Sequence, residues 1–296
     1  MARFLTWFRN NVDGLVALVL ALVVGVLAVI DVLGTDTVDA AVLLVLALLA
    51  TTLLRDRHLS AKAMRDASSV QMLNGPEIGH QHTLARRDTE KWIFKGGTGT
   101  YIRAVTLKEC VRNARQAQRS LRVRLEILDP TNELLCKTYA EFRASVAPDA
   151  TRARDPWTTR RVQQESFGTV LAACWYKQQY SPLDIAVGFS SVMTTFRWDL
   201  STSCVIITQD NPNTPAMMFE RDKPYYRDFS RELDSSFDQA KKVPLGNARD
   251  VQLDDPPTVE QVRAVFDALG LPLPASFEDR DVAEIVRRAL NPENPF

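Results

Sequence analysis

Neither sign of charge is in excess in this sequence of 296 residues, because 36 lysine and arginine residues balance 36 aspartate and glutamate residues. A neutral chain gives no electrostatic reason to bind nucleic acid in bulk, so no nucleic-acid partner is expected. Cysteine is scarce, and its four residues stand far apart, with neither a disulfide framework nor metal-ligand spacing. Isolated thiols in apolar surroundings are typical of buried cysteines in a reducing compartment.

Histidine is scarcer still, and all three residues, His58, His80 and His82, precede the part of the chain with regular α/β patterning. The interior of that part therefore lacks the commonest general base, which counts against histidine-dependent hydrolysis. His80 and His82 are spaced to bind one metal ion, but a site needs three or four ligands and no Cys, Asp or Glu cluster joins them. A polar loop is the favoured interpretation, so no catalytic residue, metal or cofactor is assigned.

Charge is absent from two apolar runs near the N-terminus, Gly14–Ile30 and Ala40–Leu54. A bilayer core requires about 20 apolar residues, with a lower limit near 17, and the pair of runs predicts a two-helix transmembrane hairpin. A signal peptide explains only the first run, and no small-residue cleavage site follows Ile30. A buried hairpin in a globular core is the other alternative, but such helices normally keep a polar stripe.

Basic residues flank the two runs, whereas the loop between them holds Asp31, Asp36 and Asp39 and no lysine or arginine. This distribution predicts a multi-pass protein of the cell inner membrane, with both termini in the cytoplasm and the lipid bilayer as a partner. Two helices cannot enclose a pore, so any opening of the membrane would require an oligomer of this chain.

The rest of the chain has the patterning of an α/β domain with a mixed sheet. Leu121–Pro130 alternates apolar and polar residues before an Asp-Pro turn, which predicts a strand, whereas Thr106–Ser120 has helical periodicity. The predicted order of elements is β-α-β-α-α-β-β-α. The expected segments are a cytoplasmic tail (1–12), the hairpin (13–54), a juxtamembrane helix and linker (55–90), the α/β domain (91–245) and a C-terminal helical appendage (246–296).

Two stretches near the domain are predicted to be irregular, and two near the end of the chain to be helical. Asn74–Arg87 shows no periodicity and predicts a linker or irregular edge, and Thr194–Leu200 predicts a tight connection between strands. Beyond Asp254 two amphipathic patterns predict helices, the first capped by Thr258 and ended by Gly270. These helices are expected to dock a protein partner through residues 254–296.

The runs Ile93–Ala114, Arg122–Arg143 and Leu183–Thr208 together resemble one half of the phospholipase D-like fold. The resemblance covers about Lys91 to Leu245 and follows that family's glycine-marked start, its strand ending in Asp-Pro and its paired later strands. Active members carry His-x-Lys-x4-Asp, but no His-x-Lys occurs here, and the matching turn contains Arg197. The resemblance therefore implies an inactive member that keeps phosphate-ligand binding, and a homodimer, since active members pair two halves.

An anion pocket is the sharpest site prediction, formed by Gly96, Gly97 and Gly99 with Arg103 and Arg197. Glycine-rich backbone presents N–H groups to phosphate, and arginine supplies paired donors. The loop lacks the Walker spacing and a following Lys-Ser/Thr, so a turn of glycines beside surface arginines is the alternative.

Other candidates have ordinary structural alternatives. Asp129 is either a carboxylate at a strand end or a turn residue before proline, and the turn is favoured. A base-stacking group or simple core packing explains the aromatic residues Trp157, Trp175, Tyr176 and Tyr180. Anionic headgroups or solvent are the alternative partners of the arginines Arg152, Arg154, Arg160 and Arg161.

Three functional hypotheses follow. The first is a non-enzymatic sensor or effector, whose domain binds a nucleotide, another phosphate-bearing ligand or a protein and controls association of the membrane helices. This layout resembles that of two-helix membrane effectors in bacterial anti-phage signalling. The second is a membrane-tethered hydrolase or transferase, and the third is an anchor that recruits a partner through residues 254–296.

Overall fold

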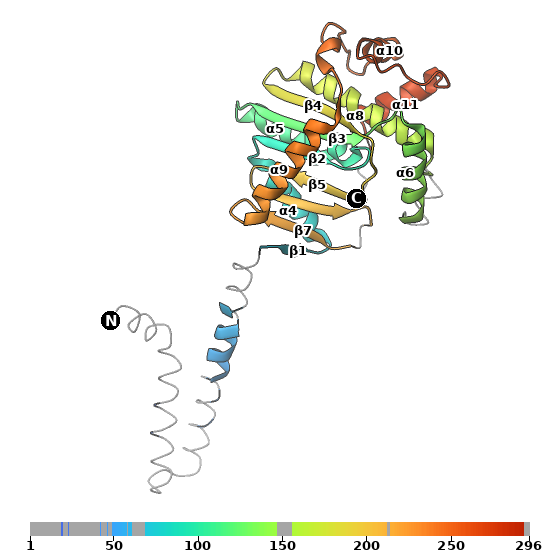
Figure 1. Cartoon of the computed structure of the whole chain (residues 1–296). Coiled ribbons are helices and arrows are strands. Elements are labelled where there is room, and N and C mark those ends of the chain that lie inside the picture. The colour runs from blue at the N-terminus through green and yellow to red at the C-terminus, as the bar shows by residue number, and fades with distance from the viewer. Residues whose placement is uncertain are drawn as a thin grey trace. The chain divides into compact units, whose positions relative to one another are not determined.

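The computed structural model describes three continuous stretches and a few residues nearer the N-terminus. The chain divides into two compact units, Met1–Ser68 and Ser69–Phe296 (Figure 1). The second unit holds the sheet, its helices and the candidate site. The described residues are 69–146, 156–211 and 214–292, with 19, 23, 42, 46, 49–57, 59 and 60.

Within the described residues, no helix is both long enough and apolar enough to cross a membrane. This finding overturns the transmembrane hairpin predicted over 13–54, and with it the multi-pass inner-membrane location and the lipid bilayer as a partner. The described helical stretch 49–57 carries Arg55, Asp56 and Arg57, and charged side chains are costly inside a bilayer core. Most of the two predicted runs, like the predicted N-terminal tail, lies outside the described residues.

One eight-stranded mixed sheet forms the centre of the second unit, in the order β1-β7-β6-β5-β2-β3-β4-β8. Strands β2, β3 and β4 run parallel to one another, and the other pairings are antiparallel. The strands are β1 (Gln71–Leu73), β2 (Lys91–Lys95), β3 (Leu121–Leu128), β4 (Leu183–Ser190), β5 (Phe196–Leu200), β6 (Cys204–Gln209), β7 (Ala216–Glu220) and β8 (Lys241–Lys242).

Helices cover both faces of this sheet. The α-helices are α4 (Pro76–Arg87), α5 (Leu107–Gln116), α6 (Glu133–Val146), α8 (Thr159–Gln179), α9 (Pro224–Gln239), α10 (Val259–Ala268) and α11 (Asp279–Leu290). A π-helical turn, η1 (Ile102–Thr106), precedes α5, and a 3-10 turn, η2 (Leu245–Ala248), follows β8.

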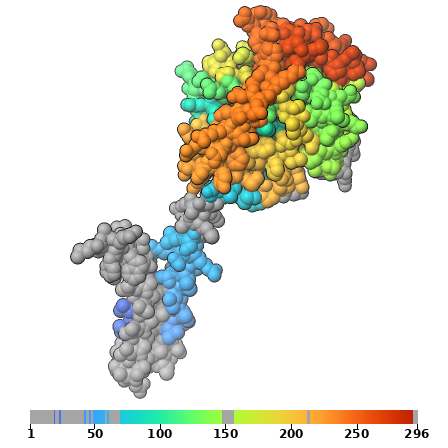
Figure 2. All heavy atoms as spheres, viewed as in Figure 1, coloured from blue at the N-terminus to red at the C-terminus, as the bar shows by residue number. Residues whose placement is uncertain are grey.

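Alternation along each strand sends neighbouring side chains to opposite layers. Leu125 of β3 is fully buried in the main core with Phe167 of α8. Its neighbour Glu126 points to the other face, where it accepts a hydrogen bond of 3.0 Å from Ser236 of α9. Figure 2 shows α9, in orange, lying across that face. The alternation predicted for β3 is therefore confirmed.

The C-terminal helices share the main core of the α/β residues. Phe266 of α10 packs edge-on against Phe167 of α8, with ring centroids 5.1 Å apart. The predicted bounds of α10 are confirmed, since Thr258 forms a capping box and Gly270, with φ of +65°, follows the helix end. A protein partner at residues 254–296 and a homo-oligomer remain predictions.

Two segments differ from the sequence-based expectation. Phe196–Leu200, predicted as a connection, forms β5 and pairs with both β2 and β6. Asn74–Arg87, predicted as a linker, contains α4, which begins at Pro76 because proline is well suited to the first helical position. The helix matters for the site, because it brings polar side chains onto the end of the sheet.

Candidate ligand-binding site

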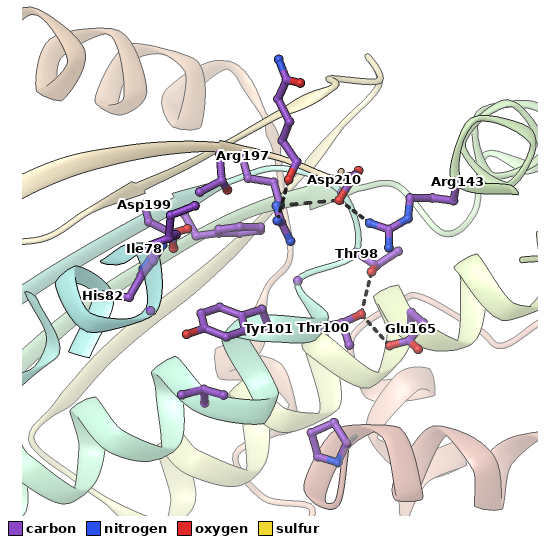
Figure 3. Close-up of a pocket in the computed structure, with 18 of the residues that line it drawn as sticks. Ile78, His82, Thr98, Thr100, Tyr101, Arg143, Glu165, Arg197, Asp199 and Asp210 are labelled. Atoms are coloured by element: carbon purple, nitrogen blue, oxygen red, sulfur yellow. Dashed lines mark hydrogen bonds and ion pairs between the residues drawn. The ribbon is translucent and has the colours of Figure 1, made fainter. Parts of the chain in front are cut away.

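A cavity of about 1090 Å³ opens beside the loop that follows β2. The loop and segments of α4, α6, α8, β5, β6 and α11 contribute its walls (Figure 3). The position is typical of α/β proteins, in which ligands bind beyond the carboxyl ends of parallel strands. The part of the cavity around Gly97, Thr98 and Gly99 is termed the loop end, and the part around His82 and Asp199 is termed the histidine end.

The loop after β2 needs glycine at two positions. A Cβ atom on Gly97 would lie 2.1 Å from the hydroxyl oxygen of Tyr139, and Gly99 has a φ of +76°. Within the described part of the chain, the backbone N–H groups of Gly97, Thr98 and Gly99 donate no hydrogen bond. A helix begins directly afterwards, at Thr100. Consecutive unpaired N–H groups at a helix start form a site for an anion.

A buried ionic network holds this loop from behind. Arg103 is completely buried, pairs with Glu165 of α8 and donates a hydrogen bond of 2.9 Å to the carbonyl of Arg288. Arg288 of α11 pairs with the same carboxylate, and Thr100 donates to it at 2.8 Å. Burial raises the pKa of Glu165, but the two guanidinium groups outweigh burial, so the pKa falls below its usual value. The loop is thereby tied to both α8 and α11.

Further arginines surround the loop end. Asp210, after β6, forms ion pairs with Arg143 of α6 and, at 3.7 Å, with Arg197 of β5. Arg143 and Arg161 both lie over the ring of Trp157, at 4.4 and 4.1 Å from its centroid. These contacts fix the guanidinium groups at the cavity wall, which lowers the entropy lost when they bind a ligand.

The histidine end has a different character. His82 of α4 is buried, and burial, followed by the charges of Arg86 and Arg197, lowers its pKa to about 3. Asp199 of β5 is also buried, which raises its pKa to about 6, and it accepts a hydrogen bond of 3.1 Å from the indole of Trp92. Figure 3 shows His82 and Asp199 together, away from the loop.

The structure brings together only part of the predicted anion pocket. Gly97, Gly99 and Arg197 line the cavity. Gly96 does not line the cavity, and a Cβ atom added to it would lie 2.7 Å from the Phe94 ring and 3.0 Å from the Arg197 side chain. Arg103 lies beneath the loop, where it supports the backbone. Its buried position explains the error, because the sequence does not show that a carboxylate 62 positions away would neutralise it.

Sequence reasoning missed several residues of the cavity. The sequence predicts headgroups or solvent as the contacts of Arg161, and for His82 it favours a polar loop over a metal site with His80. Arg287 and Arg288 of α11 reach the cavity from a segment to which no chemistry was assigned. An arginine pair at the end of an amphipathic helix is a weak signal, since most such pairs face solvent.

The remaining candidates have structural roles in the described residues. Asp129 accepts a hydrogen bond of 2.9 Å from the backbone N–H of Thr131, as the turn interpretation requires. Trp175 and Tyr176 pack against the core, whereas Trp157 lines the cavity. Arg160 pairs with Asp281 of α11 at 3.2 Å. Arg152 and Arg154 lie outside the described residues.

Cysteine and metal chemistry find no support in the described part of the chain. All four cysteines are buried free thiols, and burial raises the pKa of each, which makes them unreactive at neutral pH. No group of three or more His, Cys, Asp or Glu side chains among the described residues is arranged to hold a metal ion.

Comparison with known proteins does not identify a family. No protein-family model matches this sequence, and no curated protein matches it. A solved structure of TrmBL2, described as an archaeal chromatin protein with a novel mode of DNA binding, aligns with 69% of this chain and 68% of its own. The identity is 10% and the TM-score 0.34, a value too low to establish a common fold. The phospholipase D-like resemblance remains a prediction.

Proposed function

We propose that this protein binds a phosphate-bearing ligand at the loop end of the cavity. The observation that carries the proposal is the row of unpaired backbone N–H groups at Gly97, Thr98 and Gly99, directly before a helix. A phosphate group at this position would accept hydrogen bonds from the loop and gain from the positive end of the helix dipole.

Local charge supports an anionic ligand although the whole chain is neutral. The cavity is lined by six arginine and four carboxylate side chains, so positive groups outnumber negative ones by two. Burial raises the pKa of Asp199 to about 6, so protonation of this carboxyl increases the positive excess further as the pH falls below about 6. Positive groups in a partly enclosed cavity attract an anion more strongly than the same groups do in open solvent.

Binding is favoured over catalysis by the state of Glu165. Thr100 donates a hydrogen bond of 2.8 Å to this carboxylate, which is the arrangement of a hydroxyl nucleophile with its base. The pKa of Glu165 is lowered by Arg103 and Arg288, however, so the carboxylate is a weak base. The same ion pairs join the loop to α11. A ligand that binds the loop could therefore alter the position of the C-terminal helices.

Calorimetry and thermal unfolding of the full chain test the proposal, with pyrophosphate and inorganic phosphate compared with chloride at matched ionic strength. We expect pyrophosphate at 100 times its Kd to stabilise the fold by about 2.7 kcal/mol. Arg161→Gln should weaken pyrophosphate binding about tenfold or more, because a hydrogen bond to a charged group contributes roughly 1.5–3 kcal/mol.

Arg227→Gln is the matched control, since Arg227 is exposed on α9 and does not line the cavity. It should leave binding unchanged. Equal loss in both variants would indicate a diffuse charge effect. If neither phosphate compound binds beyond the chloride control, the proposed function is wrong.

A further inference from the structure

His82 is a buried side chain whose polar atoms have no hydrogen-bond partner among the described residues. It is 4% exposed, it makes no hydrogen bond within the described residues, and its Nδ1 atom is shielded from solvent. Arg86, one turn later on α4, is instead bonded to Glu109 at 2.7 Å and to Tyr101 at 3.1 Å. A neutral imidazole offers one N–H donor and one acceptor nitrogen, and His82 lines the cavity.

Asp199 has a second unpaired group at the same end. Its Oδ1 atom accepts from the Trp92 indole, but Oδ2 accepts no hydrogen bond from the described residues, and no lysine or arginine among them forms an ion pair with the carboxylate. The side chain is only 4% exposed. Buried polar atoms in native proteins are nearly always paired, so unpaired atoms at a cavity wall indicate groups that bind a ligand.

The surroundings of these two polar groups suit a flat ring. Ile78, Phe94 and Tyr101 also line the cavity: Phe94 pairs with Asp199 between β2 and β5, the Tyr101 ring lies 5.7 Å from that of His82, and Ile78 lies beside His82 (Figure 3). Figure 3 shows Ile78, His82 and Asp199 gathered at one side, and Thr98, Thr100 and Glu165 at the other. A ligand that spans the cavity therefore needs an anionic group at one end and a flat, hydrogen-bonding group at the other.

We propose that the ligand is a nucleotide, whose base occupies the histidine end and pairs with Asp199 and His82 while its phosphate lies on the glycine loop. This inference rests on the proposed function, because it uses the loop as the phosphate site. A nucleobase carries N–H donors beside acceptor nitrogens or oxygens on one edge, and two apolar faces. The Oδ2 atom of Asp199 accepts from an N–H of the base, and His82 pairs with a neighbouring ring or exocyclic atom.

Other phosphate compounds fit the histidine end less well. Ribose 5-phosphate carries hydroxyl groups but no flat ring to lie against Phe94 and Tyr101. Pyrophosphate would leave the histidine end unfilled and both buried polar groups unpaired. The three compounds thus separate the contribution of the base from those of the sugar and the phosphate.

Calorimetry of the full chain with pyrophosphate, ribose 5-phosphate and the four common ribonucleoside 5′-monophosphates tests the inference. We expect at least one nucleotide to bind tenfold or more tightly than ribose 5-phosphate. Asp199→Asn keeps an oxygen for the Trp92 N–H but replaces the second acceptor oxygen by an amide donor. It should bring the affinity for that nucleotide to within threefold of that for ribose 5-phosphate, with pyrophosphate binding unchanged.

Ile78→Trp is a second variant that fills the histidine end without altering either polar group. It should cause the same selective loss, and unchanged pyrophosphate binding would show that each variant is folded. If pyrophosphate binds but no nucleotide binds better than ribose 5-phosphate, the nucleotide inference is wrong and the proposed function stands. If no phosphate compound binds, both fail.

Discussion

The two ends of the cavity treat buried charge in opposite ways. At the loop end, Arg103, Glu165 and Arg288 lie together, and each charged group meets an opposite one. At the histidine end, His82 and Asp199 are equally buried, yet neither forms an ion pair in the described part of the chain. Burial shifts the pKa of each in the direction that favours its neutral form. Loss of one partner from the first arrangement would leave a buried charge uncompensated, whereas the second keeps polar groups available at a cost in stability.

The difference between the two ends predicts that substitution of Glu165 has the largest effect on the free energy of unfolding. Glu165→Gln leaves Arg103, which is completely buried, without a counter-charge, and should lower the free energy of unfolding by about 3–5 kcal/mol. Chemical denaturation of the full chain measures this change. Asp184→Asn is the control, because Asp184 pairs with Arg124 while half-exposed and should cost less than about 1 kcal/mol. Similar losses in the two variants would show that the buried network contributes no more than a surface pair.

Asp199 gives the next largest expected effect on the free energy of unfolding, and this effect depends on pH. The unfolded carboxyl releases its proton near pH 3.8, whereas the folded one holds it to about 6. The folded state therefore binds more protons between these values, and the stability contributed by the neutral group is lost as pH rises from about 4 to 6. The loss is about 3 kcal/mol for a shift of about two pKa units.

Comparison of the wild type with Asp199→Asn isolates this contribution. His82 acts in the opposite direction, because its pKa is lowered to about 3 and its contribution to stability rises with pH through the same range. His82 remains in both proteins, so the difference in unfolding free energy removes its contribution. We expect the stability of the wild type relative to Asp199→Asn to fall by about 2 kcal/mol from pH 4 to 6, and by nearly the full ~3 kcal/mol from about pH 3 to 7. A difference independent of pH would mean that Asp199 is ionised throughout this range.

Four of the eight described strands, β2, β3, β4 and β6, and about half of the proposed anion pocket could be predicted from the sequence. The strict alternation from Leu121 to Leu128 places apolar side chains in one layer, and the glycines after β2 mark a loop where Cβ atoms do not fit. These features depend on neighbouring residues alone. They are therefore visible in the order of the amino acids.

The histidine end could not be predicted in the same way. Helix α4 lacks an apolar stripe, because its buried face contains His82 and Arg86 where a helix usually has Leu or Ile. The burial of Arg103 depends on Glu165 and on Arg288, which is 185 residues away. Local periodicity contains no information on such distant charge pairing, so a surface arginine and a buried one have the same sequence signal.

The smallest effect is expected at Thr100, where the loop joins the ionic network. Thr100→Val removes a hydroxyl that donates to Glu165 at 2.8 Å and contacts the Thr98 hydroxyl at 3.0 Å. Because two arginines still neutralise Glu165, the loss in unfolding free energy should be about 1.5 kcal/mol, the lower end of the range for a hydrogen bond to a charged group. Thr138→Val is the control, since its hydroxyl bonds only to the backbone of exposed α6 residues. A loss at Thr100 close to that of Glu165→Gln would mean that the hydroxyl, rather than the paired charges, holds the loop end together.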